Sequence, residues 1–231
     1  MRAARILAAA ARVFVRNGVE NATMEMIARE AQVAVGTIYL HFASRDEVYL
    51  SLRAKFAEGL SVQYREVKAR GLAPIEELRA LAHAYVEHLG ESAEPVLTSE
   101  PTSHSEIRQR LRRASEIREF DRGLDLSRDV FHLFENTVRR AFEAGLIADP
   151  LGPTGVTVGI WAILNGAYMV TRDQEFFQDI TGLNPDGFTA KALESYLRGI
   201  LSTPKNRTNR STASKRKSTI IRLPVKRRAT K

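Results

Sequence analysis

Hydrogen-bonding side chains gather in one short segment of this 231-residue chain. Residues 35–42 read VGTIYLHF, and Arg45 follows three positions later. The hydroxyl of Thr37, the phenol of Tyr39, the imidazole of His41 and the guanidinium of Arg45 can contact the phosphates and base edges of nucleic acids. They can do so only if the neighbouring elements hold this segment at the surface.

Signatures of catalysis and metal binding are missing from the sequence. It has no cysteine, which excludes a disulfide framework, a cysteine nucleophile and thiolate-bound zinc or iron–sulfur sites. It has no phosphate-binding glycine loop and no Gly-x-Ser-x-Gly elbow. His83 and His88 do not have the i, i+4 spacing of two zinc-binding histidines on one helical face. We therefore expect a protein that is not an enzyme and binds no metal or cofactor.

The surrounding elements are predicted to be helices, because apolar residues recur at helical spacing up to about residue 202 without strand-like alternation. A first helix is predicted over Ala3–Asn17, and Thr23 caps a second one. A short connection leads to the helix over 35–42. Residues 23–42 thus form a helix-turn-helix, whose second helix can enter the DNA major groove. Many helical hairpins bind nothing, so the spacing alone does not establish DNA binding.

Further helices follow, two of them opened by the capping boxes Ser44–Glu47 and Ser103–Glu106. The expected ranges are 44–70, 74–90, 103–120, 125–145, 155–177 and 185–201. Residues 91–102, with two prolines and many polar residues, are expected to be a loop. The prediction is an all-α fold of about nine helices, in which a small N-terminal unit is joined through a long helix to a larger bundle.

A specific pattern of residues surrounds the helix-turn-helix. It comprises Ile6, Leu7, Ala10, Phe14, Gly18, Thr23, Ile27, Ala28, Ala31, Val33, Gly36, Thr37, Ile38, Tyr39, His41, Phe42 and Arg45. This pattern resembles the DNA-binding domain of TetR-type (TetR/AcrR) bacterial transcriptional regulators, without a gap over residues 3–52. The resemblance implies a DNA-binding domain over 1–52 and a ligand-binding and dimerisation domain over 53–202.

Roles for single residues follow from the resemblance and agree with their chemistry. Three residues are expected mainly at phosphates: Thr37, His41 and Arg45. Three are expected on the surface that enters the groove: Val35, Gly36 and Tyr39. Thr23 should also meet a phosphate at the amino end of its helix, although capping alone would explain it. Three residues that alternate with the reading face are expected in the core: Ile38, Leu40 and Phe42.

Three positions depart from the common pattern of the family. Gln32 stands where glycine is common, and a left-handed conformation there costs on the order of 1 kcal/mol relative to glycine. Ala34 replaces a serine-like cap, which forfeits about 1 kcal/mol. Arg45 stands where lysine is common and keeps the charge with a different geometry.

For residues 53–202, the resemblance implies a homodimer formed through the last two helices and an internal pocket for a small-molecule effector. Two apolar faces fit such an interface: Val156, Ile160, Ile163, Leu164 and Ala167, and Phe188, Leu193, Tyr196, Leu197 and Ile200. Candidate pocket residues combine apolar bulk with polar groups: Phe56, Tyr64, Tyr85, His88, Phe131, Phe134, Trp161, Asn165 and Tyr168. Each of them could instead be ordinary core. Asn165 needs a partner, because an unpaired buried amide costs roughly 1–3 kcal/mol.

The net charge of +8 comes from one end of the sequence. Residues 203–231 hold 11 of the 35 Lys and Arg residues and no acid, so residues 1–202 have 24 basic against 27 acidic residues. This basic tail is too polar to bury a core and is expected to be disordered. It is either a solvated tail without a selected function or a phosphate-binding arm. In the second case the chain could be a non-specific, architectural DNA-binding protein.

The expected location is the bacterial cytoplasm, with association to the nucleoid when DNA is bound. The longest nearly uncharged stretch, 156–170, is shorter than the roughly 20 residues of a membrane-spanning helix. Arg12 and Arg16 interrupt the N-terminal apolar run, so no signal peptide is expected. The predicted function is a ligand-responsive regulator, a repressor that binds a palindromic operator as a homodimer and is released by a small molecule.

Overall fold

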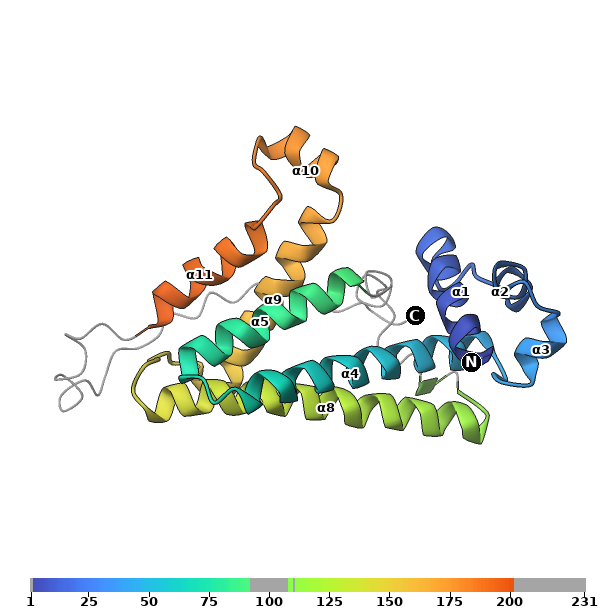
Figure 1. Cartoon of the computed structure of the whole chain (residues 1–231), viewed down its shortest axis with the longest axis horizontal. Coiled ribbons are helices and arrows are strands. Elements are labelled where there is room, and N and C mark those ends of the chain that lie inside the picture. The colour runs from blue at the N-terminus through green and yellow to red at the C-terminus, as the bar shows by residue number, and fades with distance from the viewer. Residues whose placement is uncertain (1, 92–107, 110, 202–231) are drawn as a thin grey trace, which may run out of the picture. The chain divides into compact units, whose positions relative to one another are not determined.

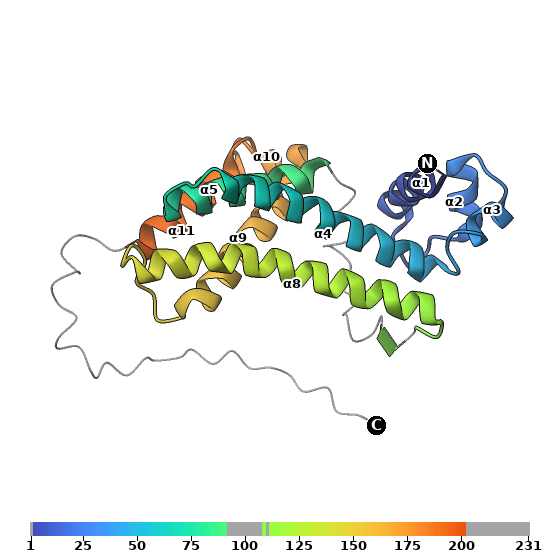
Figure 2. The same cartoon turned by 60° about the horizontal axis from the view of Figure 1, so that its bottom comes forward.

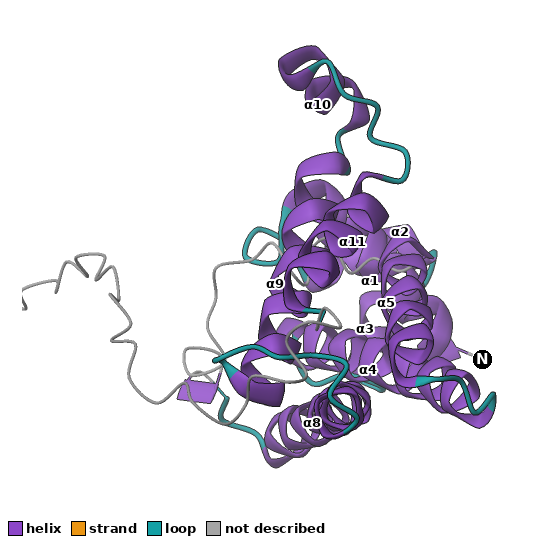
Figure 3. Ribbon diagram, turned by 90° about the vertical axis from the view of Figure 1, so that its left-hand side faces the viewer, coloured by secondary structure: helices purple, strands orange, loops and turns teal. Residues whose placement is uncertain are grey.

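A computed structural model describes three parts of the chain: residues 2–91, 108–109 and 111–201. The described part is built of nine α-helices and contains no strand longer than a single bridge, so the all-α prediction is confirmed (Figure 3). The expected capping box at Ser103–Glu106, nearly all of the expected loop over 91–102 and the basic tail lie outside the described residues.

The N-terminal helices are α1 (Arg2–Asn17), α2 (Met24–Ala31), α3 (Val35–Tyr39) and the first turns of α4 (Arg45–Ala69). α1 packs against α2 and α4, and α3 follows α2 after a short turn (Figure 1). Helical spacing places Ile6, Val13 and Phe14 on one buried stripe of α1. This stripe packs with Ile27 and Ile38 in one hydrophobic core, which fixes α3 against α1 and α2.

The remaining helices form a bundle with a second hydrophobic core. They are α5 (Pro74–Glu91), α8 (Ala114–Glu143), α9 (Gly152–Thr171), α10 (Gln174–Thr181) and α11 (Phe188–Ile200). α4 and α8 lie side by side over most of their lengths (Figures 1 and 2). α9 packs against α8 and α11, and α10 joins the ends of α9 and α11 that are remote from α8 (Figures 1 and 3).

The prediction of two helices over 103–120 and 125–145 is wrong, because residues 114–143 form one continuous helix, α8. The expected break falls at Gly123, which remains helical. A Cβ placed at Gly123 would lie 3.7 Å from the Cβ of Ala54, so this turn packs directly on α4. Packing along α4 outweighs the roughly 1 kcal/mol that a glycine costs inside a helix.

The prediction of one helix over 155–177 is also wrong, because α9 ends at Thr171 and α10 begins at Gln174. The carboxylate of Asp173 accepts a hydrogen bond from the Phe176 amide at 3.1 Å and so caps α10. α10 ends at Thr181, and Gly182, whose φ of 69° is left-handed, caps it.

α9 is longer than the 156–170 stretch considered in the sequence. Among the described helices it is the one whose length and composition would allow it to cross a membrane. Val156, Ile160 and Leu164 of α9 are buried within the bundle core, whereas Val158 and Val170 of the same helix are exposed, so packing inside the chain accounts for one face of this helix.

Candidate nucleic-acid interface and internal pocket

The turn between α2 and α3 contains two residues that differ from the common family pattern, Gln32 and Ala34, and both have the features expected from the sequence. Thr23 is extended, and its Oγ1 accepts a hydrogen bond from the Met26 amide at 3.2 Å, which caps α2. Gln32 has a φ of 54°, the one left-handed non-glycine residue in the described part of the chain. Ala34 precedes α3 without a side-chain cap. The sequence therefore tolerates two local costs at this turn, and packing of the N-terminal core offsets them.

α3 presents one face to solvent and one to the core. Ile38 is fully buried, whereas Val35 is 37% and Tyr39 52% exposed. A Cβ at Gly36 would meet nothing within 4 Å, so this position leaves open space in front of the backbone. The exposed residues Val35, Gly36 and Tyr39 are the three predicted to enter the DNA groove.

The expectation for Leu40 is wrong. α3 ends at Tyr39 rather than at residue 42, and Leu40 is 83% exposed instead of buried. Phe42, beyond the end of the helix, is buried as expected. Leu40 is a large apolar residue at the solvent-exposed end of the reading helix.

The expected phosphate contacts have different surroundings. Thr23 and His41 are exposed, and Thr37 is half-buried. Arg45 is engaged within the chain: its guanidinium donates to the main-chain oxygen of Glu20 at 2.6 Å and lies 3.3 Å from carboxylate oxygens of Glu20 and Asp46. Contact of these residues with phosphates remains a prediction.

Ion pairs fix α2 on α1. The guanidinium of Arg12 lies 2.6 Å from Glu30, and Arg16 pairs with the same carboxylate. Hydrogen bonds from Arg12 and then Arg16 hold the pKa of Glu30 below its usual value. Arg5 donates to the carbonyl of Ala31 at 2.8 Å, just before the turn. These contacts set the angle at which α2 delivers the chain to α3.

A polar cluster joins the start of α4 to the start of α8. The Ser44 hydroxyl donates to a carboxylate oxygen of Glu116 at 2.6 Å, and the other oxygen accepts from the amides of Arg112 and Arg113 at 3.1 and 3.0 Å. Burial favours a raised pKa at Glu116, but the Ser44 and backbone hydrogen bonds outweigh it and the pKa is lowered. The predicted capping box differs in detail, because Glu47 accepts from the Ala43 amide, at 2.6 Å. The cluster connects the bundle to the residues that follow α3.

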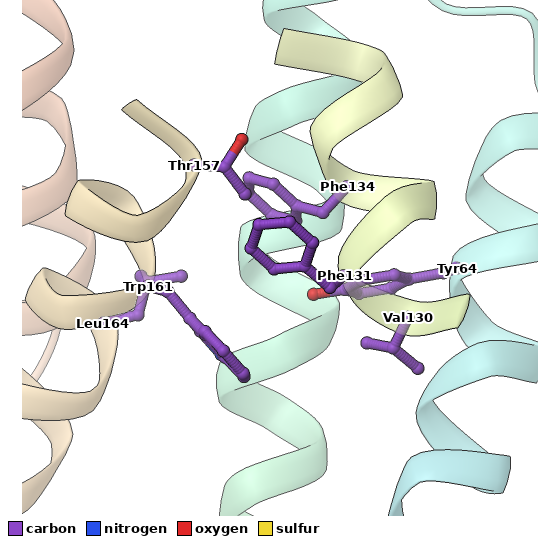
Figure 4. Close-up of a pocket in the computed structure, with 7 residues that line it drawn as sticks. All are labelled: Tyr64, Val130, Phe131, Phe134, Thr157, Trp161 and Leu164. Atoms are coloured by element: carbon purple, nitrogen blue, oxygen red, sulfur yellow. The ribbon is translucent and has the colours of Figure 1, made fainter. Parts of the chain in front are cut away.

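An internal pocket lies between α4, α8 and α9 (Figure 4). About 300 Å³ of space, part of it open to solvent, is enclosed by side chains that carry no charge. The lining residues are Tyr64, Val130, Phe131, Phe134, Thr157, Trp161 and Leu164. We call this the aromatic pocket. Four of its residues were among the pocket candidates from the sequence: Tyr64, Phe131, Phe134 and Trp161.

The other five sequence candidates do not line the aromatic pocket; their side chains bond or stack within the bundle. The Tyr85 hydroxyl donates to the Asn165 side-chain oxygen at 2.9 Å, and Asn165 donates to the Trp161 carbonyl at 2.8 Å. Asn165 is only partly buried and has two hydrogen-bond partners within the chain. The His88 ring lies 4.5 Å from the Phe56 ring, centroid to centroid. The Tyr168 hydroxyl donates to the Leu89 carbonyl at 3.2 Å.

Three pocket residues were missed by sequence reasoning: Val130, Thr157 and Leu164. Val130 and Leu164 repeat at the same helical spacing as core residues, so no sequence signal separates a residue that lines a cavity from one that fills it. Thr157 is 2% exposed, and its only signal in the sequence is its position in the second turn of an apolar helix.

Most residues of the two predicted dimer faces are buried inside this chain. Val156, Ile160 and Leu164 of α9 pack with Leu193 and Leu197 of α11 in the bundle core. A Cβ at Gly159 would lie 2.6 Å from the Tyr196 hydroxyl, so this glycine permits the close approach of α11. The apolar faces predicted for the homodimer interface therefore pack mostly against each other within one chain, between α9 and α11.

Exposed apolar residues lie on other positions of α9 and on the α10 segment. They are Val158, Trp161, Val170, Phe176, Ile180 and Leu183.

Comparison with known proteins identifies the N-terminal segment. Residues 6–52 match the family described as "Bacterial regulatory proteins, tetR family". The HTH-type transcriptional repressor KstR2 of Mycobacterium tuberculosis is 33% identical over 86 residues, which are 37% of this chain and 43% of that protein. The matched region spans less than half the length of the curated relatives.

Solved structures share the fold of both helical parts. A regulatory protein of the tetR family from Rhodococcus RHA1 has a TM-score of 0.67 at 20% identity, covering 87% of this chain and 97% of that one. The transcriptional regulator FadR of Bacillus subtilis, solved with stearoyl-CoA, has a TM-score of 0.62 at 18% identity and covers 85% of this chain and 98% of that one. The match of residues 6–52 and the exposed reading helix within them lead to one conclusion: this segment of the chain is a DNA-binding domain of the tetR family of bacterial regulatory proteins, and the described helices as a whole share the fold of the solved structures.

Proposed function

We propose that this protein is a DNA-binding transcriptional regulator of the bacterial cytoplasm that represses its target genes and responds to a small molecule. The observation that carries this proposal is α3, which the N-terminal core holds at the surface through buried Ile38 while Val35 and Tyr39 face solvent. A helix presented in this way fits the DNA major groove. The relative KstR2 is named a transcriptional repressor, which supports repression over activation.

In this proposal the contacts divide into two kinds. Val35, Gly36 and Tyr39 read the groove, and exposed Thr23 and His41 flank them at the phosphates together with half-buried Thr37. The open space at Gly36 favours close approach of the α3 backbone to a base edge.

A homodimer would give the operator its symmetry. Two copies related by a two-fold axis place two α3 helices in successive major grooves, about 34–36 Å apart, and so select a palindromic site. The exposed apolar residues of α9 and the α10 segment are the surface that such a dimer would cover.

The aromatic pocket provides the site of response. Its Tyr64 belongs to α4, the helix that follows α3 after a connection of five residues. Three of its residues belong to α8, whose first turn binds Ser44 through Glu116. A ligand that shifts α4 or α8 therefore acts on both elements that hold the DNA-binding domain.

The function is tested by selecting DNA from a random pool with the purified protein at about 150 mM salt, which weakens contacts made only to phosphates. We expect one palindromic motif. Tyr39→Ala should abolish its recovery while the protein stays folded, because Tyr39 is half exposed and contributes little to the core. Val15→Ala, which removes an exposed apolar side chain of α1, is the matched control and should recover the wild-type motif.

Two results would contradict the proposal. An unchanged motif with Tyr39→Ala would remove Tyr39 from the reading surface. Recovery of no motif, with binding that vanishes as salt rises, would favour the alternative of a non-specific DNA-binding protein driven by the 11 Lys and Arg residues of 203–231.

A further inference from the structure

We propose that the aromatic pocket binds a compact, uncharged molecule with an apolar body and one hydrogen-bond acceptor. This inference rests on the proposed response to a ligand and specifies its chemical class. It concerns the free protein, so it can be tested without DNA.

The walls of the pocket exclude a charged ligand group. Five of the lining side chains are aliphatic or aromatic hydrocarbon or indole, and the other two are neutral hydroxyl-bearing residues, Tyr64 and Thr157. Burying an ionised group against such walls is costly unless a counter-charge or several hydrogen bonds compensate it. The rings of Phe131 and Trp161, 6.2 Å apart between centroids, instead offer apolar faces to a ligand.

Three basic residues of α8 that are close in sequence to the lining residues have carboxylate partners. On α8, Arg128 precedes the lining residue Val130 by two positions in the sequence, and its guanidinium lies 2.9 Å from the carboxylate of Asp125. His132 lies 3.4 Å from Glu135, which also binds Arg139 at 3.1 Å. An anionic ligand would have to displace these carboxylates to gain a counter-charge.

Tyr64 supplies the polar contact. Its side chain is 2% exposed and reaches from α4 toward the space beside Phe131 and Trp161 (Figure 4). Its hydroxyl makes no hydrogen bond to another residue in the described part of the chain. Burial, together with nearby Tyr85, raises the pKa of Tyr64 well above its ordinary value, so the phenol stays protonated and donates. A ligand carbonyl, ether or hydroxyl oxygen is the acceptor that matches it.

Thr157 complements Tyr64 without competing with it. Its hydroxyl donates to the Pro153 carbonyl at 2.8 Å, which uses its proton. Tyr64 is thus the buried hydroxyl donor that the pocket can offer. The pocket is small and partly open to solvent, which favours a compact ligand over an extended chain.

The charge preference can be tested with three probes of the same shape: 2-adamantanone, 1-adamantanecarboxylate and 1-adamantylamine at pH 7.5. Trp161 is the single tryptophan of the chain and lines the pocket, so its fluorescence reports occupancy, with calorimetry on the same samples as a second readout. We expect saturable binding of the ketone. The carboxylate and the ammonium probe should bind at least about 10-fold more weakly, because each would bury an unpaired charge.

The donor is tested with Tyr64→Phe, which removes the hydroxyl and keeps the ring. Loss of one neutral hydrogen bond should weaken ketone binding by about 2- to 10-fold. Tyr196→Phe removes a hydroxyl of α11 that does not line the pocket and should leave the affinity unchanged. Circular dichroism melting of both variants establishes that they fold.

Carboxylate binding as tight as ketone binding would overturn the inference, as would the absence of ketone binding by both readouts up to the solubility limit. Equal ketone affinities of Tyr64→Phe and the wild type would remove Tyr64 as the donor. The DNA selection is independent of these outcomes. Ketone binding without a selected DNA motif would refute the proposed regulator but support the inference about the pocket. A selected DNA motif without ketone binding would support the regulator and refute the inference about the pocket.

Discussion

At the scale of single residues, Arg45 has two competing uses. The resemblance to TetR-type regulators places it at a phosphate, whereas its guanidinium in the free protein binds the Glu20 carbonyl and the carboxylates of Glu20 and Asp46. Only 25% of its side chain is exposed. These contacts tie the start of α4 to the connection between α1 and α2, so we expect Arg45 to position α4 rather than to bind DNA.

This distinction predicts the salt dependence of an Arg45→Ala variant. A lost phosphate contact lowers the slope of log affinity against log salt by about 0.9 per subunit. A lost positioning contact leaves the slope unchanged and lowers the free energy of unfolding by about 1 kcal/mol. We expect the second result, measured by DNA titrations at several salt concentrations and by urea unfolding. Arg45→Lys keeps the charge and serves as the control; a reduced slope for Arg45→Ala alone would return Arg45 to the phosphates.

Some features of single residues could be predicted from the sequence and others could not. The caps at Thr23 and Ser44 and the left-handed Gln32 were predicted, because each depends on a few adjacent residues. Leu40 was misplaced, because its exposure depends on where α3 ends, and the backbone leaves the helix after Tyr39. The aliphatic pocket residues Val130 and Leu164 were missed, because only the arrangement of three helices distinguishes them from core.

At the scale of elements, a buried carboxylate holds three helices together. Glu77 of α5 is 1% exposed and lies 3.0 Å from both Lys68 of α4 and Arg140 of α8, and the Thr137 hydroxyl donates to it at 2.5 Å. Burial favours a raised pKa, but the hydrogen bonds from Thr137, Lys68 and Arg140 outweigh it, so the pKa of Glu77 is lowered.

The lowered pKa of Glu77 predicts how stability depends on pH. A carboxylate with a depressed folded-state pKa contributes its stabilisation above the unfolded value of 4.5, and the contribution is lost as pH falls through the folded pKa. At pH 7, Glu77→Gln should lower the free energy of unfolding by about 3 kcal/mol, since it leaves two cations without their partner. This difference should shrink below pH 4.5 in urea unfolding series. Glu143→Gln, exposed at the end of α8, should change little; a pH-independent difference for Glu77→Gln would contradict the linkage.

The contact between Ser44 and Glu116 predicts a variant in which ligand and DNA binding are uncoupled. One carboxylate oxygen of Glu116 accepts a hydrogen bond from Ser44, and the other accepts from two backbone amides. In Glu116→Gln the side-chain NH₂ group replaces one of these oxygens. It then faces a hydrogen-bond donor, so the hydrogen bonding on that side is lost. We expect this variant to bind 2-adamantanone and DNA separately, while the ligand-induced change in DNA affinity, typically about 5- to 150-fold in coupled systems, falls toward one. The readout is an operator titration with and without the ketone. Glu119→Gln, one turn later and paired with Arg122, should retain the coupling; retained coupling in Glu116→Gln would exclude this route.

Some helix boundaries are determined by adjacent residues, and others depend on contacts with residues that are distant in the sequence. Asp173 and Gly182 are local signals that could have separated α10 from α9, because an N-cap and a left-handed glycine are visible in the sequence. The continuity of α8 is non-local. The turn at Gly123 stays helical because it packs against Ala54 of α4. Ala54 is distant in the sequence, so the residues around Gly123 could not predict this contact.

At the scale of the whole molecule, the charge is divided between two parts of the chain. Residues 1–202 carry 24 basic and 27 acidic residues, and several arginines near the helix-turn-helix are paired, as Arg12 and Arg16 are with Glu30. The compact unit Met1–Leu201 therefore has a net charge of 24 − 27 = −3, which does not attract DNA. Sequence preference and electrostatic affinity could thus come from different parts of one protein, α3 for the first and residues 203–231 for the second.

Deleting residues 203–231 tests this division. The deletion removes 11 positive charges and no negative ones, so fewer counterions should be released on binding and the slope of log affinity against log salt should become shallower. Base contacts of α3 would be intact, so non-specific affinity should fall more than specific affinity and their ratio should rise. Titrations of the selected motif and of a scrambled duplex between about 50 and 200 mM salt measure both quantities. A full-length variant with the 11 Lys and Arg residues replaced by Gln should match the deletion, because charge rather than chain length is the cause. An unchanged slope would place residues 203–231 away from DNA and leave the phosphate contacts to the compact unit alone.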